Sequence, residues 1–239
     1  MNFSKATGAR LMLDLNLVGP VHSDDWSVSL RQIDALFEHT SAAMPARADA
    51  GGGVWAFELG NENQDTRGPA TAAARVAAVA ASMRKHWPTK AKRPLLIGPS
   101  AHLEPDWMID FVAELSKTAG GLDVYAYHMY SGFGKAPHIA SQVPTPAFLD
   151  DARGLVDVGV SAVRSSVLPQ LPLMGTETAA AWASGGPTGA CISFGSCFWY
   201  FDHLAHAASV LGGHVAVARQ TLVGGNYSLV DANDNWRAH

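Results

Sequence analysis

Short apolar runs alternate with amphipathic segments along almost the whole chain. Each run is brief and nearly continuous, which is typical of parallel strands that are buried on both faces. The runs predict six strands, at residues 11–17, 54–59, 95–97, 122–127, 171–174 and 215–218. The segments between them repeat apolar residues at helical spacing, as Val76, Val79 and Met83 do. This alternation predicts βαβ units around a parallel sheet, and therefore an α/β fold.

The number of strands limits the architecture. A closed (β/α)8 barrel needs eight strands, so about six βα units predict a partial TIM barrel. No internal repeat or low-complexity linker marks a domain boundary, and 48% hydrophobic residues among 239 are ample for one core. We therefore expect residues 1–239 to form a single domain.

Charge and hydropathy argue against two classes of partner. A net charge of −4 with neutral histidines gives no electrostatic footprint for nucleic acid or for an anionic membrane. Residues 1–10 lack the apolar core of a signal peptide, so none is expected. Charged and histidine residues interrupt the apolar run at 193–213, which predicts a buried helix rather than a transmembrane segment.

Two features in and just before this run suggest alternative interpretations. Asp202, His203 and His206 have a spacing that could place metal ligands on one helix face. No third ligand cluster accompanies them, so we interpret the histidines as a pair on a helix surface and predict no metal site. Cys191 and Cys197 lie close together in apolar sequence, and we expect two buried thiols on a helix rather than a disulfide.

Two predicted strands end in a glutamate, Glu62 after Gly60-Asn61 and Glu177 after Gly175-Thr176. Taken alone, Asn61 and Glu62 favour helix capping. The capping interpretation is weaker for Glu177, because the Thr-Ala-Ala-Ala that follows offers no ion-pair partner. Two carboxyl groups at the carboxyl ends of separate strands are what glycoside hydrolysis requires, with one proton shared between them near neutral pH.

A third strand ends in the sequence Tyr125-Ala-Tyr127-His128-Met-Tyr130. Aromatic rings with a polar tip suit sugar rings, which stack on flat faces and form hydrogen bonds at their edges. The alternative is a core aromatic cluster, and it could hold for either Tyr125 or Tyr127. His128 falls where the strand opens to the predicted site, so we expect a functional role for it.

These segments resemble the heparanase-like glycoside hydrolase family 79, a family of endo- and exo-β-glucuronidases. It belongs to the clan whose catalytic glutamates follow strands four and seven of the barrel. The resemblance is carried by residues 13–16, 58–62, 97–99, 127–130 and 175–178, and it is densest at 198–204 and 218–229. The last block resembles plant-type members in particular.

The resemblance implies a role for each matching residue. Glu62 matches the proton donor, Glu177 the nucleophile, and Asn61 the asparagine that contacts the sugar 2-hydroxyl. Further positions match residues that contact the sugar: Asn16, His128 and Tyr130. Others match the loops that hold the uronic carboxylate: Gly185, Gly186, Gln220, Gly225 and Tyr227.

The chain also departs from the family pattern. The first two barrel strands have no counterpart before Met1, and the C-terminal β-sandwich has none after His239, so relative to the family the chain is truncated at both ends. Members that cleave heparan sulfate carry basic residues along the cleft. Here residues 100–106 contain no Arg or Lys and only Lys135 stands after Tyr130, so highly sulfated substrates are not expected.

The sequence therefore predicts a retaining β-glucuronidase-type glycosidase that acts by double displacement, without a metal or organic cofactor, on a carbohydrate that contains uronic acid. The alternative is an inactive barrel fragment with at most weak carbohydrate binding. A clan relative such as a xylosidase is disfavoured by the block at 219–229. The resemblance implies a secreted, lysosomal or vacuolar, or membrane-associated location, and neither nucleic acid nor a transmembrane segment is expected.

Overall fold

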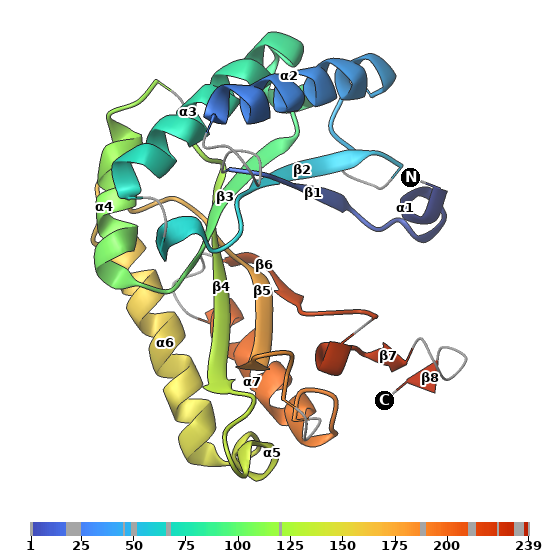
Figure 1. Ribbon diagram of the computed structural model, residues 1–239, viewed down its shortest axis with the longest axis vertical. Helices are drawn as coiled ribbons and strands as arrows, with labels where there is room; N and C mark the ends of the chain where they lie inside the picture. The colour runs from blue at the N-terminus through green and yellow to red at the C-terminus, as the bar shows by residue number, and fades with distance from the viewer. Residues whose placement is uncertain are drawn as a thin grey trace. The chain divides into compact units, whose positions relative to one another are not determined.

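The computed structural model describes residues 2–17, 25–44, 46–48, 52–65, 68–119, 121–186, 190–209, 214–223, 225–231 and 237–238 (Figure 1). The chain divides into two compact units. The first unit contains residues 1–126 and 163–172, and the second contains residues 127–162 and 173–239.

The helices and strands alternate in the predicted way. The first unit contains α1 (Asn2–Thr7), β1 (Leu11–Leu15), α2 (Trp26–Ala43), β2 (Val54–Leu59), η1 (Asn63–Asp65), α3 (Pro69–His86), η2 (Lys90–Lys92), β3 (Leu95–His102) and α4 (Pro105–Ser116). Strand β4 (Val124–Phe133) begins in this unit and continues into the second. The second unit adds α5 (Ile139–Gln142), α6 (Pro146–Arg164, whose last two residues belong to the first unit), β5 (Leu173–Trp182), α7 (Gly195–Ser209), β6 (His214–Arg219), η3 (Gly225–Tyr227), β7 (Val230–Asp231) and β8 (Arg237–Ala238).

The six predicted strands are all present and follow the order β1-β2-β3-β4-β5-β6 in one sheet. The pairs β1–β2, β2–β3 and β5–β6 are parallel. The predicted α/β class is therefore confirmed. Three strands extend further toward their carboxyl ends than the apolar runs predicted, because β3 reaches His102, β4 reaches Phe133 and β5 reaches Trp182.

The core of the first unit forms around β2, in which every residue is buried. The Phe57 ring lies 4.8 Å from that of Phe37 on α2, and the Phe37 ring lies 5.8 Å from that of Trp87. Asp25 caps the N-terminus of helix α2, and its carboxylate accepts a hydrogen bond from the Ser27 amide. These contacts pack α2 and α3 against β2. They do not involve the segment after the carboxyl end of the strand, which carries Asn61 and Glu62.

The core of the second unit contains Trp199 of α7, which is fully buried and donates from Nε1 to Ser131 Oγ at 2.8 Å. Its indole stacks on His203 at a centroid distance of 5.0 Å. Burial lowers the pKa of His203 to about 4. The predicted histidine pair on a helix surface is therefore wrong for His203, which belongs to the core.

The other two residues of the predicted cluster, Asp202 and His206, pair with side chains of α6. His206 Nε2 lies 2.8 Å from Asp157 Oδ1, and Asp202 accepts a hydrogen bond from Arg153 Nε at 2.9 Å. The predicted pair of buried thiols on a helix is also wrong, because Cys191 is buried before α7 begins and Cys197 on the helix is exposed.

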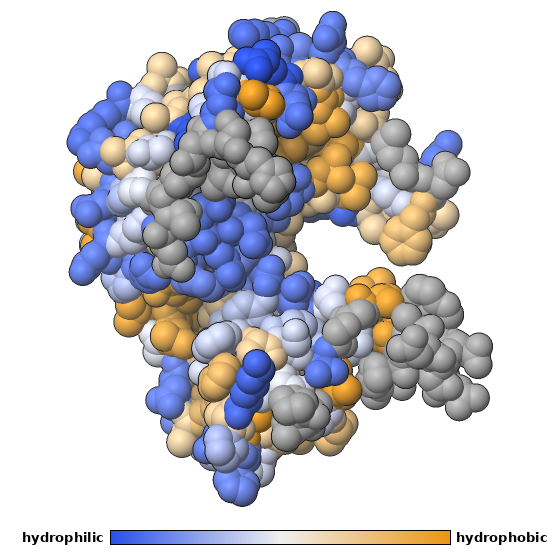
Figure 2. Space-filling model, viewed as in Figure 1, coloured by the Kyte–Doolittle hydropathy of each residue, from blue (hydrophilic) through white to orange (hydrophobic). Residues whose placement is uncertain are grey.

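The first and last strands of the order are the least buried. Leu11, Met12 and Leu13 of β1 are half-buried, and Val215 of β6 is 44% exposed. Figure 2 shows apolar side chains, in orange, over the part of the first unit that contains β1, β2 and α2. Among the described residues, no helix has the length and apolar character that a membrane crossing needs.

Candidate active site

In the first unit, the predicted site residues lie at the carboxyl ends of neighbouring strands. Asn16 follows β1 and is exposed, and Asn61 and Glu62 follow β2. His102 is the last residue of β3. Because neighbouring parallel strands end at the same edge, these four side chains occupy the edge where barrel enzymes carry out their chemistry.

A tight turn presents Glu62. Gly60 has φ of 86°, and a Cβ at this position would lie 2.9 Å from the carbonyl oxygen of Pro99, so only glycine fits without displacement. Glu62 itself has φ of 51°, in the left-handed region. Its amide donates to the Ser100 carbonyl at 2.9 Å, which ties the turn to β3.

The support beneath this turn is polar and buried. The Ser100 hydroxyl donates to Glu58 Oε1 at 2.5 Å, and both residues are buried. Ser100 therefore connects the backbone of Glu62 with the carboxylate of Glu58, because its carbonyl accepts from the Glu62 amide and its hydroxyl donates to Glu58. Neither Ser100 nor Glu58 was among the predicted site residues.

The Glu62 carboxyl group remains open to solvent. Its side chain is 32% exposed, and Oε2 lies 3.6 Å from Nε2 of His102, which is 40% exposed. Sequence reasoning missed His102, although the strand segment Ile97-Gly-Pro-Ser-Ala-His ends with it. An accessible carboxyl group beside an imidazole is able to exchange protons with water.

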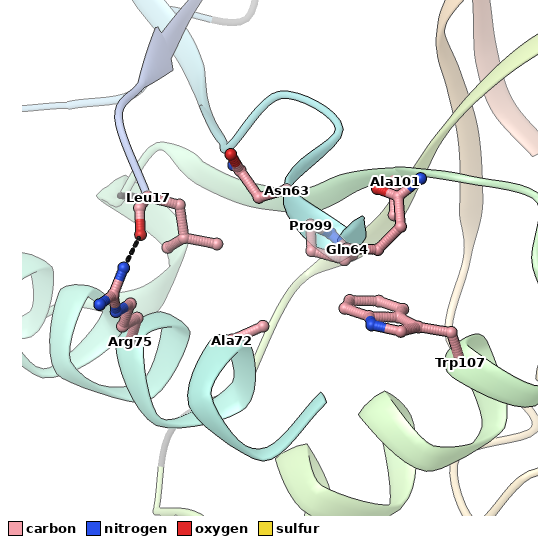
Figure 3. Close-up of a pocket in the computed structure, with 8 residues that line it drawn as sticks. All are labelled: Leu17, Asn63, Gln64, Ala72, Arg75, Pro99, Ala101 and Trp107. Atoms are coloured by element: carbon pink, nitrogen blue, oxygen red, sulfur yellow. Dashed lines mark hydrogen bonds between the residues drawn. The ribbon is translucent and has the colours of Figure 1, made fainter. Parts of the chain in front are cut away.

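A small cavity lies behind the turn, with a volume of about 10 Å³. It is lined by Leu17, Asn63, Gln64, Ala72, Arg75, Pro99, Ala101 and Trp107 (Figure 3). Arg75 Nη1 donates to the Leu17 carbonyl at 2.8 Å along this lining. Within the described residues, both amide atoms of Gln64 and Nε1 of Trp107 are buried without a hydrogen-bond partner.

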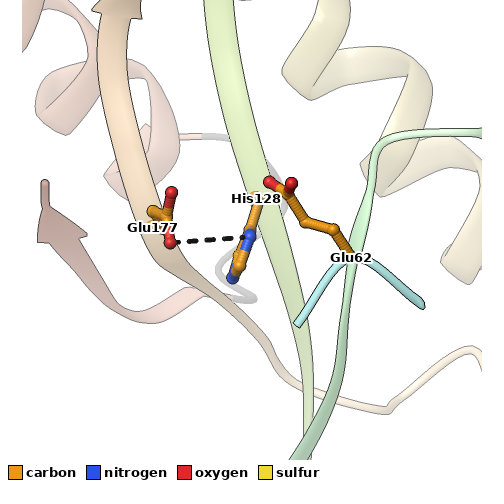
Figure 4. A group of neighbouring side chains, drawn as sticks. All are labelled: Glu62, His128 and Glu177. Atoms are coloured by element: carbon orange, nitrogen blue, oxygen red, sulfur yellow. Dashed lines mark ion pairs between the residues drawn. The ribbon is translucent and has the colours of Figure 1, made fainter. Parts of the chain in front are cut away.

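In the second unit, two residues of β4 hold Glu177 of β5. The Tyr130 hydroxyl donates to Glu177 Oε1. His128 Nδ1 lies 3.8 Å from Glu177 Oε2, and the histidine is 3% exposed (Figure 4). The structure thus brings together three predicted residues and aims the Glu177 carboxylate with one contact on each oxygen. Figure 4 also draws Glu62, on the segment that follows β2.

Tyr227 extends this group. Its ring lies 6.0 Å from that of Tyr130, at 47° between the planes. Burial raises the pKa of Tyr227, while hydrogen bonds from the backbone amides of Ser184 and Gly185 oppose that rise. The predicted residues Tyr227 and Gly185 are therefore in contact, and one predicted anion-binding amide is directed at the tyrosine hydroxyl.

The loop after β5 depends on its glycines. Gly185 and Gly186 have φ of 69° and 78°. A Cβ at Gly186 would lie 1.8 Å from the Gly134 carbonyl oxygen, and a Cβ at Gly185 would lie 2.4 Å from the Asn226 carbonyl oxygen. Close packing of three loops therefore explains why glycine occupies both positions.

The end of β6 contributes Gln220, whose amide donates to the Thr178 carbonyl at 3.0 Å. Gly225 begins η3, the turn that carries Tyr227. Arg219 was not predicted as a site residue, but its Nη2 donates to the carbonyl groups of Cys191 and Tyr227. Its guanidinium also lies 5.4 Å from the centre of the Tyr200 ring. Arg219 thereby fastens the Tyr227 turn to α7.

Two aromatic residues belong to the core. Tyr125 and Tyr127 are 0% and 1% exposed, and burial raises the pKa of each phenol above its usual range. The Tyr127 hydroxyl lies 2.9 Å from His214 Nε2, and the Tyr125 ring packs against Phe111 at 6.0 Å. The core alternative was expected for one of these tyrosines and holds for both.

The comparison with protein families decides the assignment. The model for the N-terminal domain of glycosyl hydrolase family 79 matches residues 1–205. The chain belongs to glycosyl hydrolase family 79. This confirms the resemblance inferred from the strand-end motifs.

Two curated relatives are similar to part of this family-79 chain. It is 29% identical to Heparanase-like protein 3 of Arabidopsis thaliana over 142 residues, which cover 59% of this chain and 25% of the relative. It is 29% identical to Baicalin-beta-D-glucuronidase of Scutellaria baicalensis over 138 residues, which cover 57% of this chain and 25% of the relative. The match spans about a quarter of the length of these relatives.

The fold is similar to that of solved barrel glycosidases. The GH51 arabinofuranosidase from Xanthomonas axonopodis pv. citri superposes with a TM-score of 0.64 at 14% identity, over 96% of this chain and 49% of that one. At this identity the likeness concerns the fold. It confirms the predicted class, in which βα units are those of a (β/α)8 barrel.

Proposed function

We propose that this protein is a retaining β-glucuronidase-type glycoside hydrolase, with Glu177 as nucleophile and Glu62 as general acid/base. The observation that carries the proposal is the setting of Glu177, which Tyr130 and His128 contact from the neighbouring strand. A carboxylate held in one direction is suited to attack an anomeric carbon. Membership of a glycosyl hydrolase family supports the same reading.

The proposed reaction proceeds in two displacements. Glu177 forms a bond to the anomeric carbon while the bond to the glycosidic oxygen breaks, and Glu62 gives its proton to that oxygen. Glu62 then takes a proton from water, which attacks the anomeric carbon and releases Glu177. Two inversions leave the configuration unchanged. The mechanism uses side chains and water, and it needs no cofactor.

The surroundings of the two glutamates support this division of roles. Glu62 is 32% exposed, so water is able to reach it in the second step, where Glu62 takes the proton of the attacking water. Glu177 is 24% exposed and is held by a phenol from β4. If the roles were exchanged, Glu177 would have to give and take protons while the Tyr130 hydroxyl holds its carboxylate.

The substrate we propose is a β-linked uronide in a glycan or glycoconjugate. Tyr227, Gln220 and the Gly185-Gly186 loop lie in the same unit as Glu177, and we propose that they and Gly225 hold the uronic carboxylate. Asn16 and Asn61 follow strands of the first unit, where we propose that they contact sugar hydroxyls. One relative is named a β-D-glucuronidase, which supports this substrate class.

Two assays on the whole protein test the proposal. The values of kcat/KM for p-nitrophenyl β-glucuronide and p-nitrophenyl β-glucoside should differ strongly in favour of the glucuronide, and equal values would refute uronide specificity. Proton NMR during early turnover should show the β-anomer of the released sugar first. Initial release of the α-anomer would refute the retaining mechanism.

The retaining mechanism also sets a distance. It requires the carboxyl groups of Glu62 and Glu177 to lie about 5–5.5 Å apart, and it requires both units to act as one catalytic domain. A crystal structure with an ordered site and a separation beyond about 9 Å would exclude it.

A second candidate is a barrel fragment with at most weak carbohydrate binding. The exposure of β1 and β6 favours it, since Leu11 and Leu13 are half-buried and Val215 is 44% exposed. Apolar strand edges invite aggregation, and each uncovered apolar side chain costs about 1.5–3 kcal/mol against a net stability of roughly 5–15 kcal/mol. We predict that residues 1–239 alone unfold at low temperature and lack turnover. A sharp cooperative transition with glucuronidase activity would exclude this candidate.

A further inference from the structure

The strongest unassigned feature is the small cavity behind the Glu62 turn. Gln64 is 8% exposed and lines this cavity, and it lies two residues after Glu62 in the turn η1. Trp107, near the start of α4, lines the same cavity (Figure 3). In the part of the chain that the structure describes, Oε1 and Nε2 of Gln64 and Nε1 of Trp107 are buried without a partner. Three buried polar atoms without a partner, on two side chains that line one cavity, indicate a bound ligand, because buried polar groups are almost always hydrogen-bonded.

The size and chemistry of the cavity identify the ligand. A volume of about 10 Å³ is about what one water molecule needs. The two side chains have N–H donors, at Trp107 Nε1 and Gln64 Nε2, and one acceptor, Gln64 Oε1. One water accepts two hydrogen bonds and donates two, so it is able to satisfy all three atoms. A metal cation is disfavoured, because the indole N–H and the nearby Arg75 guanidinium present hydrogens rather than lone pairs.

We propose that one buried water binds between Gln64 and Trp107, and that Gln64 acts through it as a positioning residue for the general acid/base. Without the water, the Gln64 side chain has no polar contact with α4. With it, η1 is joined to α4, while the Glu62 amide is already joined to Ser100 of β3. Both ends of the turn are then fixed, and the Glu62 carboxyl group keeps its direction toward the departing oxygen. This inference rests on the proposed function of Glu62, but the binding of water does not.

The first test is structural and needs no activity. A high-resolution crystal structure of the whole protein should show one density peak about 3 Å from both Gln64 and Trp107 Nε1. Hydrogen exchange at the amides of residues 61–65 should accelerate in Gln64→Met, which removes the amide, and in Trp107→Phe, which replaces the indole and its N–H by a smaller apolar ring. An empty cavity, or unchanged exchange in both variants, would overturn the proposal.

The second test separates positioning from general loss of structure. Gln64→Met should lower kcat/KM about tenfold more for a glucuronide with a poor leaving group than for p-nitrophenyl glucuronide, because only the poor leaving group needs the proton. Ser82→Ala is the matched control, since Ser82 is also buried and bonds to Asp34 away from the cavity. It should affect both substrates equally. Equal losses in Gln64→Met would contradict the positioning role.

The outcomes also distinguish this inference from the proposed function. If the wild-type protein binds the water but hydrolyses no glucuronide, the function fails and the water site stands. If it hydrolyses glucuronides and the variants leave the dependence on the leaving group unchanged, the function stands and the positioning role fails. Should Gln64→Met not fold, Trp107→Phe carries the same comparison.

Discussion

The surroundings of Glu62 and Glu177 differ in how each carboxyl group is held. Glu62 stands on a turn with a left-handed backbone, and its carboxyl group lies 3.6 Å from the half-exposed His102. Glu177 stands within a strand and contacts Tyr130 and the buried His128 from the next strand. One carboxyl group is fixed through its backbone and left open to water, whereas the other is fixed through its oxygens. The difference matches the needs of a proton carrier and of a nucleophile.

The largest effect should follow from removing the proposed nucleophile. Glu177→Gln keeps the size of the side chain and the contact with Tyr130 but removes the negative charge. We expect kcat to fall by at least about a thousandfold on every glucuronide, since nothing replaces the attacking oxygen. Steady-state assays with natural and p-nitrophenyl substrates measure this, and substantial turnover in the variant would refute the assignment.

Removal of the proposed proton donor should have a selective effect. Glu62→Ala should reduce turnover of poor leaving groups by about a hundredfold or more, while an acidic phenol still departs without protonation. The activated substrate should then accumulate the glycosyl-enzyme, because the second step lacks its base. Equal losses on activated and natural substrates would contradict the role of Glu62.

Tyr130→Phe probes the restraint on Glu177. The variant removes the hydroxyl that donates to Oε1 and should lower kcat by about ten- to a hundredfold with little change in the melting temperature. Tyr125→Phe is the matched control, because Tyr125 is a tyrosine of the same strand and its hydroxyl has no partner among the described residues. It should leave kcat unchanged. Equal effects of the two changes would mean that the Tyr130 hydroxyl is only structural.

The smallest effect should be on specificity. Tyr227→Phe removes the hydroxyl that contacts the amides of Ser184 and Gly185. We expect the ratio of kcat/KM for glucuronide over glucoside to fall by about tenfold, because one polar contact near the carboxylate is lost. A fall in both values of kcat/KM with their ratio preserved would show that Tyr227 stabilises the loop without contacting the substrate carboxylate.

The sequence predicts the strands well where burial alone controls them. The apolar run at 54–59 coincides with β2, in which every residue is buried. The carboxyl ends of β3, β4 and β5 were placed too early, because the polar and small residues near the site interrupt the apolar pattern while the backbone continues as a strand. The apolar pattern therefore underestimates the length of a strand where its carboxyl end carries residues of the candidate site.

The candidate site was predictable only in part. Glu62, His128, Tyr130 and Glu177 stand out as polar residues after apolar runs, and their positions follow from strand order. Ser100, His102 and Trp107 carry no such signal, since their roles depend on contacts between segments distant in the chain. His203 was misplaced because helical spacing alone does not tell which face meets Trp199.

The most direct test of the central claim is to trap the covalent intermediate. The whole protein is incubated with a 2-deoxy-2-fluoro-β-glucuronyl fluoride, which forms the glycosyl-enzyme but hydrolyses slowly, and is then analysed by intact mass and peptide mapping. The account predicts one fluoroglucuronyl group per chain, esterified to Glu177. A label on another residue, or turnover of glucuronides without any label, would contradict it.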